Sequence, residues 1–285
     1  VKWPVHMPPA TLPEGEREWV EGPTQSDLDT LLRDTPFAPV PDRTGRVHRT
    51  FLPDHAHYVG AAVGFVAYNF EDDPIMCLVH AEQINRLCLT TVMAQESAPG
   101  AVRHGGLFTT IPDGNLATQP SAALIGAAPG YAKSIMDLRV STMVKEAIRG
   151  PQLLRSIGLL EEIQAKHGQY TDPNHFYVYM ICASPMQRGK GVGSIIMNKL
   201  KALCDVAEHQ SELYLENSKE KNLGFYHGKH MLQVYEMLVV SRKSGNCPPV
   251  PLYVMKRKPG ADGVPVVVDD RTLEDVATPY MLNHL

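Results

Sequence analysis

The residues with the clearest chemical potential form a short loop, Arg188-Gly189-Lys190-Gly191-Val192-Gly193. Three glycines within five positions let the backbone turn sharply and approach a ligand closely. A helix is predicted to begin directly after the loop, so the free N–H groups of its first turn would point at the same spot. This arrangement predicts an anion site suited to a pyrophosphate, with Arg188 and Lys190 adding charge at its rim.

The spacing of the glycines excludes the other common nucleotide loops. A Walker loop needs Ser or Thr after its Gly-Lys pair, but Lys190 is followed by Gly191, and Ser184 stands where its first glycine would be. A dinucleotide fingerprint needs a third glycine at the position of Ser194. The sequence also lacks the HRD and DFG elements of a protein kinase. A plain structural turn stays open as an alternative.

The loop is placed between a predicted strand and a predicted helix. Residues 175–183 are a nearly continuous apolar and aromatic run, typical of a central strand buried on both faces. Residues 194–208 carry apolar side chains at helical spacing. Other strands are predicted at 46–51, 105–111, 121–126, 213–216, 234–240 and 251–256, and other helices at 26–33, 53–70, 75–94, 133–149, 152–167 and 219–227. The mixture indicates an α/β (α+β) fold.

The loop and its surroundings resemble one protein family. Residues 185–194 resemble the acetyl-CoA signature of GNAT acetyltransferases, Q/R-x-x-G-x-G/A, with Arg188, Gly191 and Gly193 in its fixed positions. Downstream, the strand at 214–217 and the residues Asn222 to Tyr226 resemble the second motif of the family, in which an acidic strand residue precedes Asn and then Phe-Tyr.

The resemblance extends over roughly residues 44–258 and is closest at 175–226. Residues 251–257 resemble the terminal strand of the family, whereas Lys229-His230-Met231 departs from the usual Lys/Arg-x-Gly-Phe ending. Upstream, residues 69–74 resemble a helix and turn of the small-molecule branch that includes puromycin-type acetyltransferases.

The resemblance implies a GNAT fold: a mixed, mostly antiparallel sheet flanked by helices and split into a V between strands 175–183 and 213–217. Acetyl-CoA would lie in the split, with its pyrophosphate on the loop amides and its pantetheine paired along 181–183 like an added strand. The cofactor-binding residues implied are Ile181, Cys182, Ala183, Arg188, Gly189, Lys190, Gly191, Val192, Gly193, Ser194, Asn217, Asn222 and Tyr226.

Two residues are candidates for the catalytic chemistry. The resemblance places Tyr226 as the general acid that protonates the departing thiolate, because a phenol is protonated at neutral pH. Glu216 ends a strand beside the split and is the candidate general base or amine-orienting group. A core tyrosine and a structural carboxylate are the alternatives. Direct attack needs no covalent enzyme intermediate, so Cys182 is not expected to be a nucleophile.

Other titratable residues are expected to have no role in catalysis or metal binding. His48, His55 and His57 lack a metal spacing with an acidic partner and are predicted to lie on the surface. His175 is interpreted as a strand-end histidine. Asp72 and Asp73 either line the acceptor pocket or end a helix. No metal site is predicted.

Composition narrows the class of protein further. The 285 residues carry a net charge of -4 and no run of five basic residues, so nucleic acid is not expected as a partner. The five cysteines are widely spaced with no CxxC pair, which predicts free thiols in a reducing compartment. The absence of an apolar run of about 18 residues, or of an apolar signal core, predicts a cytoplasmic protein.

The chain is predicted to consist of a proline-rich extension at 1–43, a GNAT domain at 44–258 and a tail at 259–285 that adds an edge strand at 264–268. The extension and the tail are candidates for a homodimer contact. The predicted activity is acetyl transfer from acetyl-CoA to the primary amine of a small molecule, because the long segment 75–170 would cap the acceptor pocket. The alternatives are a protein or peptide N-acetyltransferase, and a non-catalytic acyl-CoA-binding module.

Overall fold

The fold is given by a computed structural model of the chain. It describes residues 39–51, 56–70, 73–79, 107–112, 120–127, 163–172, 174–205, 210–242, 248–261 and 277–282. The predicted helices at 26–33 and 133–149 and the strand at 264–268 lie outside these residues.

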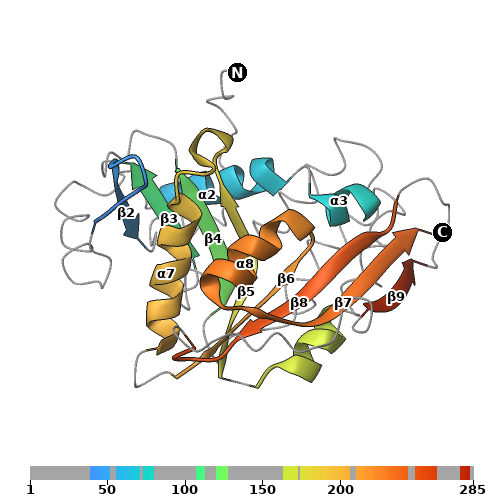
Figure 1. Cartoon of the computed structure of the whole chain (residues 1–285). Helices are drawn as coiled ribbons and strands as arrows, with labels where there is room; N and C mark the ends of the chain where they lie inside the picture. Colours follow the sequence, from blue (N-terminus) through green and yellow to red (C-terminus); the bar gives the residue numbers. More distant parts are fainter. Residues whose placement is uncertain are drawn as a thin grey trace, which may run out of the picture.

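The described strands form one mixed sheet in the order β1-β2-β3-β4-β5-β6-β8-β7-β9 (Figure 1). Their bounds are β1 Val40–Pro41, β2 Val47–Phe51, β3 Leu107–Pro112, β4 Ala122–Ala127, β5 His175–Ala183, β6 Glu212–Asn217, β7 Gln233–Arg242, β8 Val250–Arg257 and β9 Ala277–Leu282. All neighbours are antiparallel except β5 with β6 and β7 with β9. The predicted mixed, mostly antiparallel sheet of the GNAT fold is therefore confirmed.

Helices cover both faces of this sheet. Figure 1 shows α7 (Val192–Asp205) and α8 (Leu223–His230) in front of the strands and α2 (Ala56–Phe70) behind them. The alternation along β4 explains why both faces are apolar: Ala122 and Leu124 pack toward α7, and Ala123 and Ile125 pack toward α2. A helix at 163–170 lies beneath the lower half of β5 and β6, on the same face as α2.

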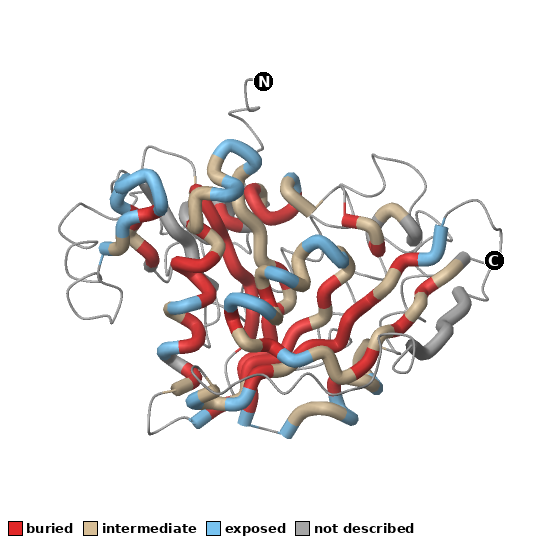
Figure 2. The backbone as a smooth tube through the Cα atoms, viewed as in Figure 1, coloured by how far each residue is buried: buried red, intermediate tan, exposed pale blue. Residues whose placement is uncertain are grey.

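The central strands carry the main core. Figure 2 shows the middle of the sheet as buried, with α7 buried on its sheet side and exposed on its outer side. Ile196, Met197 and Leu200 of α7 are completely buried against strand residues such as Leu213 and Met255. This packing holds the start of α7, and therefore the glycine loop that precedes it, in a fixed position.

The parallel pair β5 and β6 separates along its length. Their register runs from His175 opposite Glu212 to Val178 opposite Leu215. Beyond this point β5 continues to Ala183 paired with β4 alone, and β6 continues to Asn217 paired with β8 alone. The split predicted between these strands is present and opens toward their C-terminal ends.

The ends of the chain add strands that the sequence analysis did not place. The last residues of the predicted extension form β1, which pairs with β2. The tail contributes β9 along β7, thirteen residues beyond the start of the expected strand at 264–268. The expected helix at 75–94 is described only as α3 (Pro74–Val79), and the one at 219–227 begins with a 3-10 turn, Glu220–Asn222, before α8.

Candidate functional site

A cavity of about 540 Å³ occupies the split between β5 and β6. Its walls come from the glycine loop, the C-terminal ends of both strands, α8, the last two residues of α2 (Asn69 and Phe70) and Asp73. It also includes one side chain from the turn after β1, Arg43. The sheet's separation therefore creates a hollow at the point where loop, strand ends and helix meet.

The glycine loop has a backbone that only glycine adopts easily. Gly189 and Gly191 have φ angles of 80° and 94°, in the left-handed region that disfavours side chains. The amides of Gly189, Gly191, Val192 and Gly193 donate to no described residue. All four residues line the cavity. The loop thus presents unpaired N–H groups to the cavity at the positive end of α7, which is the chemistry of an anion site.

The charged residues of the loop are placed differently from one another. Arg188 is exposed and lines the cavity, with its Nε 3.4 Å from the carbonyl oxygen of Ala183. Lys190 is not among the residues that line the cavity, and its carbonyl accepts from the Arg43 amide at 2.9 Å. Backbone amides, rather than the lysine side chain, therefore dominate this part of the wall.

The end of β5 forms the neighbouring wall. Ile181, Cys182 and Ala183 all line the cavity, on the stretch of β5 that has no strand partner on the β6 side. An extended ligand can therefore add main-chain hydrogen bonds along this edge. Burial raises the pKa of the Cys182 thiol to about 12, so it stays protonated at neutral pH.

Glu216 faces the cavity from the end of β6. Its Oε2 accepts a 2.8 Å hydrogen bond from the Tyr177 hydroxyl, while its buried Oε1 has no partner among the described residues. Burial raises the pKa of Glu216 to about 7, and the hydroxyls of Tyr214 and Tyr177 partly offset this rise. The carboxyl group can therefore exchange a proton near neutral pH.

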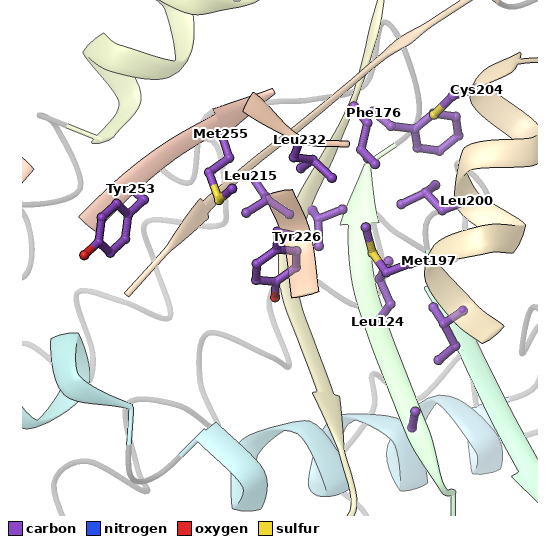
Figure 3. Close-up of a cluster of buried hydrophobic side chains, with 14 of the residues drawn as sticks. Leu124, Phe176, Met197, Leu200, Cys204, Leu215, Tyr226, Leu232, Tyr253 and Met255 are labelled. Carbon is purple, nitrogen blue, oxygen red and sulfur yellow. The ribbon is translucent and has the colours of Figure 1, made fainter. Parts of the chain in front are cut away.

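Tyr226 comes from α8 and lies at the boundary between core and cavity. Its ring packs in the main core, and Figure 3 shows its hydroxyl on the side away from Leu215 and Leu232. Burial raises the pKa of Tyr226, with further increases from Asp73 and Cys182. The hydroxyl makes no hydrogen bond with a described residue and stays protonated, so it is available as a proton donor.

The two asparagines that the resemblance implied as cofactor ligands also line the cavity. The buried side chain of Asn217 closes the turn after β6: its Nδ2 donates to the Lys219 carbonyl at 2.8 Å, and its Oδ1 accepts from the Lys219 amide at 3.2 Å. The side chain of Asn222 makes no capping bond at the start of α8. Asn222 is thus the one whose side chain is left for a ligand.

The end of the cavity near α3 is polar and carries both signs of charge, because Lys219 Nζ lies 4.0 Å from Asp73 Oδ2. Asp73 is buried there, accepting from the Ser218 hydroxyl at 2.6 Å and from the Ile75 amide at 3.0 Å. Asn69 lines the same end, and its buried Oδ1 has no partner among the described residues. Asp73 therefore both begins α3 and lines the pocket, while Asp72 lies outside the described residues.

Two predictions about histidines meet different outcomes. His48 was expected on the surface, but it is completely buried, because its ring bridges Asp42 at 2.9 Å and Ser121 at 3.1 Å. Neither His55 nor the side chain of His57 is described. His175 begins β5 as expected and is buried, with its Nε2 2.6 Å from Nε2 of His167.

The described residues contain no group of three or more His, Cys, Asp or Glu side chains able to hold a metal ion. Cys77, Cys182 and Cys204 are free thiols. None of the helices in the described ranges combines the length and apolar character needed to cross a membrane.

Sequence reasoning missed Arg43, because it lies 145 positions before the loop in a segment interpreted as an extension. It missed Tyr177 because a tyrosine in an apolar run is typical of a core strand. A signal was present in the strand alternation: Tyr177 and Tyr179 share one face of β5, next to the face of β6 that carries Glu216 and Tyr214.

Comparison with known proteins places this geometry in a class. Residues 147–230 match the family model described as the Acetyltransferase (GNAT) family. No curated protein sequence matches the chain. The chain thus carries a GNAT acetyltransferase domain, and the predicted class of enzyme is confirmed.

Solved structures show the same fold. An agmatine N-acetyltransferase mutant in its apo form is 14% identical with a TM-score of 0.50, covering 74% of this chain and 99% of that chain. Arylalkylamine N-acetyltransferase 2 from Aedes aegypti is 11% identical with a TM-score of 0.51, covering 74% of this chain and 98% of that chain. At these identities the likeness is one of fold.

Proposed function

We propose that the protein transfers the acetyl group of acetyl-CoA to the primary amine of a small molecule by direct attack. The observation that carries this proposal is the composition of one cavity. Its wall combines loop amides and a tyrosine hydroxyl that have no partner among the described residues with a carboxyl group of pKa about 7. The narrower resemblance to the puromycin-type branch remains a prediction.

The residues present fit coenzyme A. The amides at 189–193 suit its pyrophosphate, and the unpaired edge of β5 at 181–183 suits the amides of its pantetheine arm. When bound, acetyl-CoA supplies a thioester as the acyl donor. Asn222 is placed to contact the same arm from the start of α8.

Glu216 prepares the amine. An ordinary amine has a pKa near that of lysine, about 10.4, and is mostly protonated at neutral pH. Glu216 takes that proton on Oε1, directly or through water, while Tyr177 holds Oε2. The neutral amine could then attack the thioester, with backbone N–H groups at the end of β5 placed to stabilise the charge that would develop on the carbonyl oxygen. The second proton, which the nitrogen must lose as the amide forms, would pass to Glu216 once its first proton has left to solvent.

Tyr226 completes the exchange. As the carbon–sulfur bond breaks, its hydroxyl protonates the departing thiolate, and solvent restores the proton. The Cys182 thiol, with a pKa of about 12, is too poor a nucleophile to form an acyl-enzyme. The products are therefore an amide and free coenzyme A, without a covalent enzyme intermediate.

The acceptor end of the cavity supports a small cationic amine. Asp73 and Glu216 place two carboxyl groups there, although Lys219 Nζ lies 4.0 Å from Asp73 Oδ2, and the Asn69 Oδ1 has no partner among the described residues. The two structures of similar fold are those of agmatine and arylalkylamine acetyltransferases. A cytoplasmic location and a possible homodimer remain predictions.

A thiol-release assay with acetyl-CoA tests the proposal. The panel contains agmatine, polyamines, arylalkylamines, a puromycin-like amine and a short peptide with a free N-terminus. Saturable thiol release with a small amine is the expected result, and release with the peptide alone would assign the peptide alternative. Calorimetric binding of coenzyme A without turnover would favour a sensing module, and the absence of binding would overturn the proposal.

A further inference from the structure

Arg43 lies against the glycine loop although it comes from the opposite part of the chain. Its amide donates to the Lys190 carbonyl at 2.9 Å, and its guanidinium Nη1 is 3.4 Å from the Gly189 carbonyl. A Cβ added at Gly191 would meet the Arg43 Cγ at 3.5 Å. Arg43 thus lies across the loop whose amides open into the cavity.

The turn that carries Arg43 is rigidly built. The Asp42 carboxylate accepts from the Thr44 amide at 2.8 Å, the Thr44 hydroxyl at 2.6 Å and the Arg46 amide at 3.1 Å. These bonds, the Thr44 hydroxyl first, hold the pKa of Asp42 well below its usual value. Gly45, with a φ of 85°, completes the turn. Arg43 is exposed at the tip of this turn.

A buried network ties this turn to the strands that carry the site. His48 connects the Asp42 carboxylate to the Ser121 hydroxyl, and all three residues are buried. The Ser121 carbonyl in turn accepts from the amide of Ser184, four residues before the glycine loop begins, at 2.9 Å. The turn and the loop are thus fixed to the same rigid part of the sheet.

Two cationic side chains of the described residues line this part of the cavity. Arg43 and Lys229 both line the cavity, and neither forms an ion pair with a described residue. The pKa of Lys229 is lowered, first by partial burial and then by the positive charges of Arg43 and Lys201. Cations that repel one another beside unpaired amides indicate a site completed by an anion.

We propose that Arg43 is a phosphate-binding residue of the coenzyme site, closing over the glycine loop with Lys229 beside it. This inference rests on the proposed function, since it assigns the ligand's phosphates to that site. A phosphate is a stronger partner for the Arg43 guanidinium than the Gly189 carbonyl that the guanidinium now approaches. The reason is that the guanidinium can donate to two phosphate oxygens at once. The turn at 42–46 is then part of the cofactor site.

Binding measurements on an Arg43 series test this. We expect Arg43→Ala to weaken calorimetric binding of coenzyme A about tenfold, the effect of one lost charge-assisted contact. Arg43→Lys should lose less and Arg43→Glu more. Arg46→Ala is the matched control, because Arg46 is exposed on the same turn but does not line the cavity. Thermal unfolding of each variant checks that it is folded.

Two truncated ligands identify the contact. If Arg43→Ala weakens the binding of 3′-dephospho-CoA as much as that of coenzyme A, Arg43 binds the pyrophosphate. If Arg43→Ala does not weaken the binding of 3′-dephospho-CoA, Arg43 binds the 3′-phosphate. Turnover of S-acetylpantetheine, which has no phosphate, should be equal in Arg43→Ala and the wild type.

Equal binding of coenzyme A by Arg43→Ala and the wild type would refute the assignment, as would an equal loss with S-acetylpantetheine. The proposed function fails separately, when the wild type itself binds no coenzyme A.

Discussion

The two halves of β5 have different roles: residues 175–178, the closed half, pair with β6, and residues 179–183, the open half, do not. From His175 to Val178 the strand pairs with β6, and at Tyr177 and Val178 it pairs with β4 as well. From Tyr179 to Ala183 only β4 remains, and the free edge lines the cavity. The first half contributes stability through its pairing with β6, and the second offers main-chain groups to a ligand because its β6-side edge has no strand partner among the described residues.

The side chains differ in the same way. At the closed half, the rings of Tyr177 and Tyr214 pack at 5.5 Å between centroids, and His167 stacks on Tyr177 at 4.4 Å. At the open half, Glu216 and Tyr226 keep atoms free for a ligand. The Tyr177 hydroxyl joins the halves through its bond to Glu216. The comparison shows how a rigid aromatic layer can position a catalytic carboxylate across the point of separation.

The largest effect is expected from Tyr226→Phe. Tyr226 belongs to α8 and lines the cavity together with the open half of β5. Without the hydroxyl the departing thiolate gains no proton, and kcat should fall roughly 10²- to 10³-fold, the usual range for general acid catalysis. Coenzyme A affinity and the unfolding midpoint should change little, because the ring still fills the core. Steady-state thiol release and calorimetry measure both. Unchanged turnover would remove Tyr226 from the mechanism.

The next effect concerns Glu216→Gln, which keeps the shape of the side chain but cannot take a proton. We expect kcat/KM to fall about 10²-fold. In the wild type kcat/KM should rise with pH and level off above about 7, because the deprotonated carboxylate is the active form. The variant should lack this ascending limb. A limb that persists in the variant would belong to another group.

Glu216→Gln, which should lower activity, is expected to raise the free energy of unfolding at high pH. The pKa of Glu216 is raised from 4.5 to about 7 in the folded state, so folding favours the protonated form. The contribution of protonated Glu216 to the free energy of unfolding is complete below pH 4.5 and is lost as the pH rises to about 7. Above that pH, Glu216→Gln should be more stable than the wild type, by at most about 3 kcal/mol. Denaturant unfolding at pH 4 and pH 8 measures this change.

Much of the open half was predictable from the sequence. The glycines and the helix after them indicate an anion site directly in the sequence, because the backbone amides that bind an anion belong to neighbouring residues. The split between β5 and β6 followed from a family resemblance. Glu216 was placed at a strand end, but its pKa depends on burial and on two tyrosine hydroxyls that only the folded structure brings near it.

Contacts between distant segments could not be predicted in this way. Arg43 reaches the loop through a turn fixed by His48, and the histidine was wrongly expected on the surface. A histidine among polar neighbours gives no local sign of burial, because its partners Asp42 and Ser121 are joined only when β2 and β4 enter one sheet. Such networks depend on tertiary pairing rather than on periodicity.

At the closed half, Gly126→Ala should mainly affect stability. Gly126 lies at the bulge between β4 and β5, and an added Cβ would approach the Tyr177 carbonyl oxygen to 2.5 Å. Since backbone must shift to relieve this clash, we expect a loss of about 2–3 kcal/mol in the free energy of unfolding. Gly64→Ala is the control: its Cβ would meet nothing within 4 Å, and it should stabilise α2 by about 0.5–1 kcal/mol. Equal effects of the two substitutions would contradict the tight packing of the closed half.

The smallest effect should come from the residue that joins the halves. Tyr177→Phe keeps the stacked rings but removes the donor to Glu216 Oε2. That hydrogen bond lowers the pKa of Glu216, so its loss should raise the pKa above about 7 and move the ascending limb of kcat/KM to higher pH. At pH 7 we expect a decrease of less than about tenfold, the effect of one lost bond to a charged group, that largely disappears at pH 9. Tyr170→Phe is the matched control, because its hydroxyl donates to Glu236 and does not reach the cavity. A pH-independent loss in Tyr177→Phe would mean that the tyrosine supports the fold and does not adjust the carboxyl group, and the two halves of β5 would then be chemically independent.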